Sequence, residues 1–444
     1  MSNDDKPSRH RSVPSSRIGR LGGFTRLAGG VAGGMLSEGA RRLASGERPS
    51  MDQLLLTPGN VRRLTDRLAH LRGAAMKLGQ MISMDAGDVL PPELSDILSR
   101  LRDRADFMPP RQLDKVLQQE WGKDWRRKFR RFEPRPIAAA SIGQVHRALT
   151  PDGRTLAIKV QYPGVAQSIG SDVDNVATLL KLTGLLPPEL DIAPLLVAAK
   201  EQLHEEADYE REGQMMTRFG ELLADQPQFV VPALDTDLTT PRILAMSYEE
   251  GSPIEALADA EQGIRDEVFA HLVELVAREL FEAQLMQTDP NFANYRWQAS
   301  TGRIVLLDFG AAREVSDTIS QDYRRLLTAG LAEDRGAVLD AAIDAGFVNP
   351  KALDRHPQAM RKAVDIAVTQ MARPEPLDFG DRAFVPEIRE TVMPIARDRE
   401  SWHLPPAETL FVQRKVSGTA LLGARLKARV DVRGIVQRVL EKAR

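Results

Sequence analysis

Two short polar motifs in the second half of the chain constrain its fold and chemistry more than any other feature. The first runs from Gln287 to Asn294 with the sequence QTDPNFAN, and the second is Asp308-Phe309-Gly310. An Asp followed five residues later by an Asn is the spacing with which one side chain orients an attacking group and the other binds a metal ion in phosphoryl transfer. Asp308 ends an apolar run, Ile304–Leu307, and a carboxylate delivered there can hold Mg²⁺ against phosphate oxygens. Either motif alone could be a polar turn, but together they predict Mg²⁺-dependent nucleotide chemistry.

A lysine lies inside an apolar segment upstream of both motifs, Leu156–Val160. The turn signal Pro151-Asp152-Gly153 precedes this segment, so we expect a β-hairpin. A buried ammonium needs a partner, since burying even an uncharged polar group without a hydrogen bond costs roughly 2–7 kcal/mol. Lys159 is therefore expected to contact nucleotide phosphates and a glutamate from a helix, for which the acidic run Glu205–Glu212 supplies candidates. The alternatives are an edge strand that keeps the lysine in water, and a solvated helix face for the acidic run.

The composition excludes several classes of function. The chain has 60 Lys and Arg against 62 Asp and Glu, and this near-neutral balance argues against nucleic-acid binding as its main activity. It has no cysteine and only seven histidines, which excludes disulfide scaffolds and thiol nucleophiles and argues against a metal cage built by the protein alone. Neither an apolar stretch of about 18 residues nor the apolar core of a signal peptide is present. We therefore expect a reducing, cytosolic compartment.

Hydrophobic patterning divides the chain into four expected parts. Residues 1–50 carry nine Lys and Arg against four Asp and Glu and are rich in Ser, Gly and Pro, which is typical of a flexible basic arm. Apolar residues at helical spacing predict a helical extension over 51–130. Short alternating runs followed by amphipathic patterns predict a small β-containing lobe over 131–250, and a mostly helical lobe with one short strand should fill 251–444. This α+β organisation is typical of a two-lobed nucleotide-binding fold.

Two further segments point to a family. Where ordinary protein kinases have a glycine-rich loop before the strand lysine, this chain has Ala138-Ala139-Ala140-Ser141. Left-handed backbone costs an alanine roughly 1–2 kcal/mol, so this loop should not fold over phosphates as a glycine loop does. The second segment is Lys77-Leu78-Gly79-Gln80, in the helical extension. Together with Glu206-Ala207-Asp208 and the motif at 287–294, these segments resemble the UbiB/AarF family of atypical kinase-like proteins, close to its coenzyme Q-linked members, from about Val13 onward.

The resemblance implies a protein kinase-like fold with a small N-lobe, a larger helical C-lobe and an added N-terminal helical extension. In that family the K-x-G-Q helix covers the nucleotide site and blocks the groove of a protein substrate. ATP or ADP and Mg²⁺ are the implied cofactors. The implied catalytic residues are Asp289 as the base, Lys159 paired with Glu212, and Lys77 facing Glu206; the implied nucleotide-binding residues are Ala138, Ala139, Ala140, Ser141, Lys159, Gln80, Glu206, Asp208 and Glu249; and the implied metal ligands are Asn294 and Asp308.

Three functions stay open. The leading hypothesis is a Mg²⁺-dependent ATPase or small-molecule kinase that supports ubiquinone biosynthesis at the membrane surface, acting on or around lipid intermediates and with other proteins of that pathway. The second is a nucleotide-gated lipid-binding or scaffold protein that presents quinone precursors, which the basic arm and apolar helices such as Val176–Leu186 favour. The third is a protein Ser/Thr kinase, although no Ala-Pro-Glu follows Asp308 and Ala311–Leu327 should turn directly into a helix. We expect peripheral membrane attachment, in a bacterial cytosol or on the matrix side of a mitochondrion.

Two segments have no role in this scheme. The basic run at 123–131 is flanked by Trp121 and Trp125. It fits anionic headgroups or nucleic acid, with membrane contact preferred, but a solvated helix face is the simpler interpretation. The segment Phe411–Gly418 resembles a family pattern of the helical lobe, and its residues indicate no function by themselves.

Overall fold

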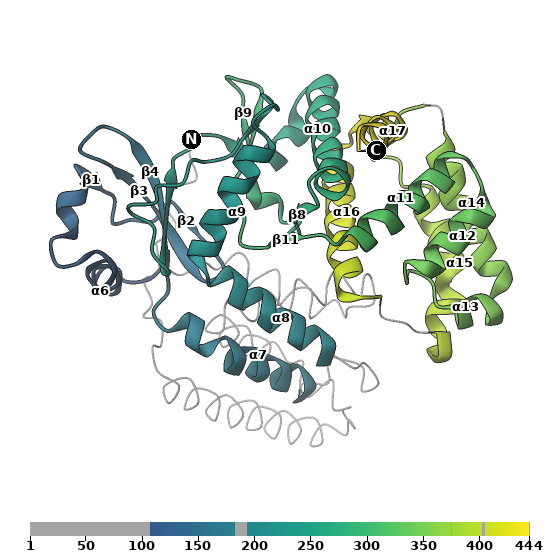
Figure 1. The fold of residues 1–444 in the computed structure, drawn as a ribbon, viewed down its shortest axis with the longest axis horizontal. Coiled ribbons are helices and arrows are strands. Elements are labelled where there is room, and N and C mark those ends of the chain that lie inside the picture. Colours follow the sequence, from purple (N-terminus) through teal and green to yellow (C-terminus); the bar gives the residue numbers. More distant parts are fainter. Residues whose placement is uncertain (1–106, 183–192, 374, 402–404, 444) are drawn as a thin grey trace, which may run out of the picture. The chain divides into compact units, whose positions relative to one another are not determined.

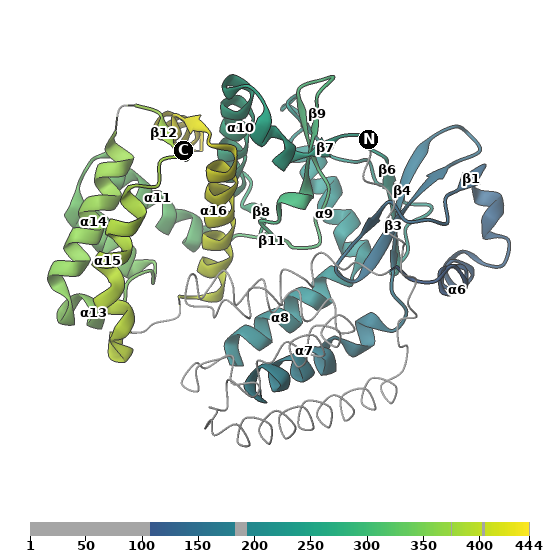
Figure 2. The ribbon, with the colours of Figure 1, turned by 180° about the vertical axis from the view of Figure 1, so that it is seen from behind.

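The computed structural model describes residues 107–182, 193–373, 375–401 and 405–443. The described chain divides into two units, which Figures 1 and 2 show from opposite sides. Unit 1 contains the described residues up to Gln214 together with Ala233–Tyr248, and unit 2 contains Met215–Pro232 and the described residues from Glu249 onward. The expected basic arm, most of the helical extension, and the site residues Lys77 and Gln80 lie outside the described residues.

An antiparallel five-stranded sheet forms the centre of unit 1 (Figure 1). The strands β3 (Gly143–Leu149) and β4 (Thr155–Gln161) pair along their whole length. Gly153 has φ 92° in the turn between them, a conformation that glycine adopts without strain, and the predicted hairpin is confirmed. β4 is paired on its other side with β6, so it is an interior strand. The remaining strands of this sheet are β1 (Arg131–Phe132), β2 (Ala138–Ala139) and β6 (Ile243–Ser247).

An aromatic cluster packs against one side of this sheet. The helix α6 (Pro110–Trp121) begins with a proline at its first turn, where the missing N–H costs no hydrogen bond. Trp125, in the short helix η3 (Trp125–Lys128), lies 5.1 Å from Phe132 between ring centroids, and Trp121 lies 5.3 Å from Phe129. The two tryptophans therefore serve the core. The basic side chains of the same segment are all exposed to solvent.

Three helices follow the hairpin along the chain. They are α7 (Val165–Leu182), α8 (Ala193–Glu206) and α9 (Tyr209–Leu222), and they agree with the amphipathic patterns of the sequence. The backbone N–H of Arg211 donates to the carboxylate of Asp208 (3.0 Å), which caps the first turn of α9. The boundary between the two units falls within α9, after Gln214.

Unit 2 contains more strands than the sequence predicted. β5 (Phe229–Val230) pairs in parallel with β10 (Arg303–Leu306), which continues through β9 (Tyr295–Gln298) to β7 (Ser252–Pro253). Two further ribbons join β8 (Leu285–Gln287) to β11 (Ala312–Glu314), and β12 (Leu377–Asp378) to β13 (Arg429–Val430). The expectation of a single strand within residues 251–444 was wrong, because strands of two to four residues carry too little alternation to be recognised.

Helices form the rest of unit 2. The expectation that a helix starts near Ala311 was wrong, because Ala312–Glu314 pairs with β8 and the helix begins only after Ser316, whose hydroxyl accepts the N–H of Ile319. No described helix is both long enough and apolar enough to cross a bilayer. Strands and helices together confirm the predicted α+β class. The helices are α10 (Gln262–Phe281), α11 (Asp317–Leu331), α12 (Arg335–Asp344), α13 (Pro350–Arg355), α14 (Pro357–Ala372), α15 (Phe384–Arg397), α16 (Ala407–Leu426) and α17 (Val432–Lys442), with short helices η4 (Ile254–Asp259), η5 (Phe292–Asn294) and η6 (Arg399–Ser401).

Candidate functional site

Lys159 and Glu212 form a buried ion pair in unit 1. The Lys159 ammonium lies 2.8 Å from Oε1 and 2.9 Å from Oε2 of Glu212, and the two side chains are 10% and 1% exposed. Lys159 also lies 5.1 Å from the ring centroid of Tyr209, at cation–π distance. Because β4 is paired on both sides, the edge-strand alternative for Lys159 is excluded, and the expected pairing with Glu212 is confirmed.

The alanine segment of unit 1 is extended and does not form a phosphate-cradling loop of the glycine type. Ala138 and Ala139 pair with Val145 and Gln144 of β3, and none of the residues 138–141 has a positive φ. The hydroxyl of Ser141 donates to the carboxylate of Glu206 at 2.9 Å. This hydrogen bond brings the end of the alanine segment to the end of α8, so two of the expected nucleotide-binding segments meet.

The junction between α8 and α9 is held to the sheet next to Lys159. The Gln161 side chain on β4 donates to the backbone carbonyl of Ala207 at 2.9 Å, in a buried position. Asp208 is exposed and caps α9, and this contact aligns the helix that carries Glu212. Glu249, one of the expected nucleotide-binding residues, belongs to unit 2, where it is half-buried two residues after the end of β6.

Asp289 and Asn294 lie on a loop of unit 2 that leaves β8 and returns as β9. The N–H of Asn291 donates to the Asp289 carboxylate (3.2 Å), which forms a tight local turn. Thr288 donates through its hydroxyl to the carbonyl of Ala311 (2.8 Å), and the N–H of Leu307 donates to the carbonyl of Asn294 (3.0 Å). These bonds join the loop to the segment that carries Asp308.

Asp308 follows β10 and accepts the N–H of Gly310 at 3.0 Å. The next side chain, Phe309, is 1% exposed and packs against Phe219 with ring centroids 5.2 Å apart. The Asp308 carboxylate and the Asn294 amide oxygen are hard oxygen donors of the kind that Mg²⁺ prefers, and Mg²⁺ in nucleotide sites usually takes one or two such ligands together with phosphate and water. The donor set of this part of unit 2 therefore fits Mg²⁺.

A second buried lysine was missed by the sequence reasoning, although it lies in the quoted segment Phe411–Gly418. Lys415 and Glu279 are each 1% exposed, and their charged atoms are 3.3 Å apart. Burial raises the pKa of Glu279, and the ammonium of Lys415 opposes that rise. Burial alone lowers the pKa of Lys415, but the Glu279 carboxylate and Tyr295 outweigh it and raise the pKa above the ordinary lysine value. The available sequence signal was Glu279 among the apolar residues at the end of α10, which indicates a buried carboxylate. The sequence did not indicate that Lys415 is its partner.

Comparisons with known proteins show which family the chain is similar to. The ABC1 atypical kinase-like domain matches residues 100–342. The atypical kinase COQ8B, mitochondrial, of Danio rerio is 37% identical over 432 residues, which are 96% of this chain and 69% of the relative. The atypical kinase COQ8, mitochondrial, of Saccharomyces cerevisiae is 37% identical over 425 residues, 94% of this chain and 84% of that protein.

A solved structure shows the same fold at lower sequence similarity. The complex of Rv3197 with erythromycin from Mycobacterium tuberculosis matches with a TM-score of 0.61, at 23% identity, over 85% of this chain and 95% of that one. The family match covers more than half of the chain and includes both polar motifs and the strand lysine. The chain therefore belongs to the ABC1 atypical kinase-like family, the UbiB/AarF family that its motifs resemble, and is a kinase-like protein of that family.

Proposed function

We propose that this protein binds ATP with Mg²⁺ and uses it, by hydrolysis or phosphoryl transfer, to support ubiquinone biosynthesis. The observation that carries the proposal is the buried, two-point ion pair between Lys159 and Glu212. Such a pair orients a lysine for nucleotide phosphates in kinase-like folds. The names of the relatives, atypical kinases COQ8 and COQ8B, support the coenzyme Q pathway as the context.

The residues have separate roles in this proposal. Lys159 contacts the phosphates and Glu212 holds its ammonium in place. Asn294 and Asp308 hold Mg²⁺, which when bound neutralises charge on the phosphates. Asp289 orients the attacking group and takes its proton. The residues proposed to surround the nucleotide are Lys77, Gln80, Ala138, Ala139, Ala140, Ser141, Glu206, Asp208 and Glu249.

The structure of the segment after Asp308 favours a small acceptor for the phosphoryl group, either water or a lipid headgroup, over a protein acceptor. Ala312 pairs with Gln287 within the ribbon of β8 and β11. Both the N–H and the hydroxyl of Ser316 then donate to Glu408, at 2.7 and 2.9 Å, and α11 begins at Asp317. This short, tied segment leaves little chain with which to dock a peptide. We therefore propose work at a membrane surface, on or around quinone-like lipid intermediates and beside other proteins of the pathway, with no role for nucleic acid.

The decisive experiment measures ATP turnover by the full chain with Mg²⁺, with and without anionic liposomes and a quinone-precursor mimic. Asp308→Asn should lower turnover by on the order of 100-fold or more, because the charge that binds the metal is lost. Asp340→Asn, at an exposed position of α12, is the matched control and should behave as wild type. Absence of Mg²⁺-dependent nucleotide binding, or full activity of the Asp308 variant, would refute the proposal.

The liposome arms separate this function from a lipid-binding or scaffold role. If lipid is a substrate or effector, turnover should change when liposomes carry the mimic. If nucleotide binds and turnover never responds to lipid or mimic, a nucleotide-gated scaffold becomes the better description. Transfer of labelled phosphate to a separate protein would instead support a protein kinase.

A further inference from the structure

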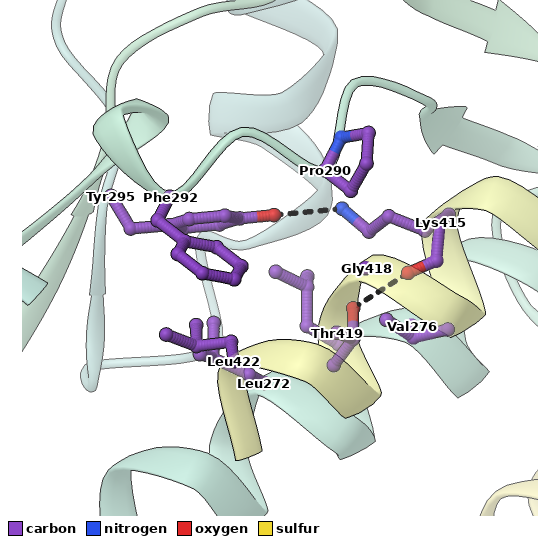
Figure 3. A pocket seen from close by; sticks show the side chains of 10 residues that line it. Leu272, Val276, Pro290, Phe292, Tyr295, Lys415, Gly418, Thr419 and Leu422 are labelled. Carbon is purple, nitrogen blue, oxygen red and sulfur yellow. Dashed lines mark hydrogen bonds between the residues drawn. The ribbon is translucent and has the colours of Figure 1, made fainter. Parts of the chain in front are cut away.

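Lys415 of α16 lies beneath the loop that carries Asp289 and Asn294 (Figure 3). Its ammonium donates to the hydroxyl of Tyr295 at 3.0 Å and to the side-chain oxygen of Gln287 at 3.4 Å. Gln287 is the last residue of β8 and Tyr295 is the first of β9. One ammonium therefore contacts both ends of this loop.

The same face of α16 contacts the middle of the loop. Gly418, one turn after Lys415, lies directly against Pro290, and a Cβ at position 418 would be 2.0 Å from the Cβ of Pro290. Figure 3 shows Lys415 and Gly418 on the side of α16 that faces the loop. The helix thus approaches the loop at its start, at its middle and at its end. The absence of a side chain at Gly418 is what permits this approach.

Glu279 fixes the position of the ammonium. It belongs to α10, which leads into β8, so its carboxylate connects that preceding helix to the ammonium of Lys415. Removing two charges from water costs several kcal/mol per ion, and apolar residues of similar volume are often as stable or more stable at such a position. A buried pair of this kind is therefore a weak means of stabilising a fold. Its charge and its directed hydrogen bonds are what an apolar pair cannot reproduce.

The group formed by Lys415, Glu279, Gln287 and Tyr295 is not a ligand site. The cavity lined by Leu272, Phe292, Tyr295 and Lys415 has a volume of about 10 Å³, which is room for roughly one water molecule. The Lys415 side chain is 1% exposed, which leaves no room for a substrate atom at its ammonium. Whatever Lys415 does for the reaction, it does through the loop.

We propose that Lys415, held by Glu279, is a positioning residue that sets the geometry of the loop from Gln287 to Tyr295 and thereby of Asp289 and Asn294. The inference rests on the proposed function for its kinetic consequence. A shift of about 1 Å in a catalytic group can cost on the order of 100-fold in rate, so small displacements of this loop are sufficient. Nucleotide affinity should depend much less on Lys415, because the ammonium does not reach the ligand.

The test separates positioning from packing with three variants of the full chain. Lys415→Met and Glu279→Met alone each leave a buried charge unpaired and should lower the melting temperature markedly. The double variant Lys415→Met with Glu279→Met removes both charges and should recover most of that loss. Its kcat should nevertheless stay at least about 10-fold below wild type, with nucleotide Kd within about 2-fold. Recovery of both melting temperature and kcat in the double variant would overturn the inference.

A readout independent of activity keeps the inference testable if the protein turns over no ATP. Hydrogen–deuterium exchange of the segment 287–295 should be faster in the double variant than in wild type, while exchange in the hairpin of β3 and β4 should be unchanged. Equal exchange in segment 287–295 would overturn the inference. An inactive wild type with the expected exchange pattern would refute the proposed function alone.

A milder variant addresses the case in which the double variant does not fold. Tyr295→Phe removes one hydrogen bond to the ammonium and keeps the ion pair with Glu279. It should lower kcat by a few-fold with little change in nucleotide Kd. An unchanged kcat together with unchanged exchange over 287–295 would count against a positioning role.

Discussion

The two units each contain a buried Lys–Glu pair, and the two pairs differ in what the lysine can reach. Lys159 has both of its carboxylate contacts below 3 Å, at 2.8 and 2.9 Å, and its side chain stays 10% exposed. Lys415 has a single, longer ion pair of 3.3 Å, is 1% exposed, and directs its hydrogen bonds to a loop. The first arrangement leaves part of the lysine side chain exposed to solvent. The second keeps an ammonium inside the protein, where only protein groups can use it.

The two pairs lie on different kinds of element, and in the proposals above the first lysine binds a ligand and the second positions a loop. Lys159 lies on a central strand, whose residues alternate between two faces, and a single helix supplies its partner. Lys415 lies on a helix that packs against an earlier helix and a loop. Exposure and the identity of the neighbouring polar groups therefore distinguish the two proposed roles better than the ion pair itself.

The largest expected effect is on catalysis through the first pair. Lys159→Met should lower ATP turnover by on the order of 100- to 1,000-fold, because a charged donor to the phosphates is lost. The matched control is Lys200→Met, which removes a lysine that is 33% exposed in the same unit and pairs with Asp174. Steady-state kinetics at saturating Mg²⁺ measures both. If Lys159→Met retains wild-type turnover, the distinction drawn between the two pairs fails.

The second prediction concerns the contact between α16 and the loop. Gly418→Ala should destabilise unit 2 by roughly 1–3 kcal/mol, because its Cβ would overlap Pro290 and the helix or the loop must move. Gly263→Ala is the control, because this residue is also helical and its added Cβ would have no atom within 4 Å apart from its chain neighbours and its own helix backbone. Alanine favours helix, so stability should be unchanged or higher. Thermal melting of both variants checks this. Equal melting temperatures would mean that α16 does not press on the loop.

The third prediction contrasts these charged groups with a buried group that stays neutral. Burial lowers the pKa of His146 from 6.5 to about 4, against a smaller opposing effect of its hydrogen bond with the Glu133 carbonyl. The pKa of His146 is lower in the folded state than in the unfolded state, so protonation of the unfolded chain at low pH favours unfolding. The folded protein therefore has its full stability, as far as His146 is concerned, above about pH 6.5 and loses stability as the pH falls toward 4. The loss should reach about 2 kcal/mol at pH 5.

Melting temperature as a function of pH tests this linkage. His146→Gln has no titrating ring, so its melting temperature should fall less between pH 6.5 and 4 than that of wild type, whatever its absolute stability. Carboxylates that titrate in the same range are common to both proteins and cancel in the difference. Parallel curves for the two proteins would show that His146 is not held neutral.

The smallest effect is expected at an exposed Lys–Glu pair. Lys362 lies 3.3 Å from Glu387, and the two side chains are 57% and 55% exposed. Lys362→Met should change stability by less than about 1 kcal/mol, since water screens such pairs, and should leave turnover unchanged. Melting in low and high salt checks this, with a small salt dependence in wild type only. A loss comparable to that of Lys415→Met would mean that burial is not what separates these pairs.

The sequence predicted the parts of the site that depend on short-range spacing. The hairpin with its glycine turn, Lys159 within a strand, and a partner for it in the acidic run were all available from local patterns. The pairing with Glu212 bridges 53 positions, but a buried lysine requires a partner and the acidic run was a natural candidate. Asp208 shows the limit of this reasoning, since its carboxylate accepts the N–H of Arg211 as a helix cap, which spacing alone did not reveal.

The short strands of unit 2 and the start of α11 were not predictable in the same way. Strands such as β8 and β11 contain only three residues each, so pairing with a distant segment, and not hydrophobic alternation, makes them strands. Ala312–Glu314 has the pattern of the helix that follows it, and the capping hydroxyl of Ser316 decides where that helix begins. Tertiary pairing overrides local propensity at both places.

The sequence by itself determined the family, the α+β class and the ordered set of polar motifs, because each depends on residue types at short, regular spacings. Only the tertiary structure decided that Lys415 contacts the loop that carries Asp289. Lys415 and Tyr295 are 120 positions apart, and a helical period shows which face of α16 is buried without showing what it is buried against. The packing of elements that are distant in the sequence determines which group pairs with a buried charge. The free-energy cost of burying an ion is offset only where that packing places a group of opposite charge beside it.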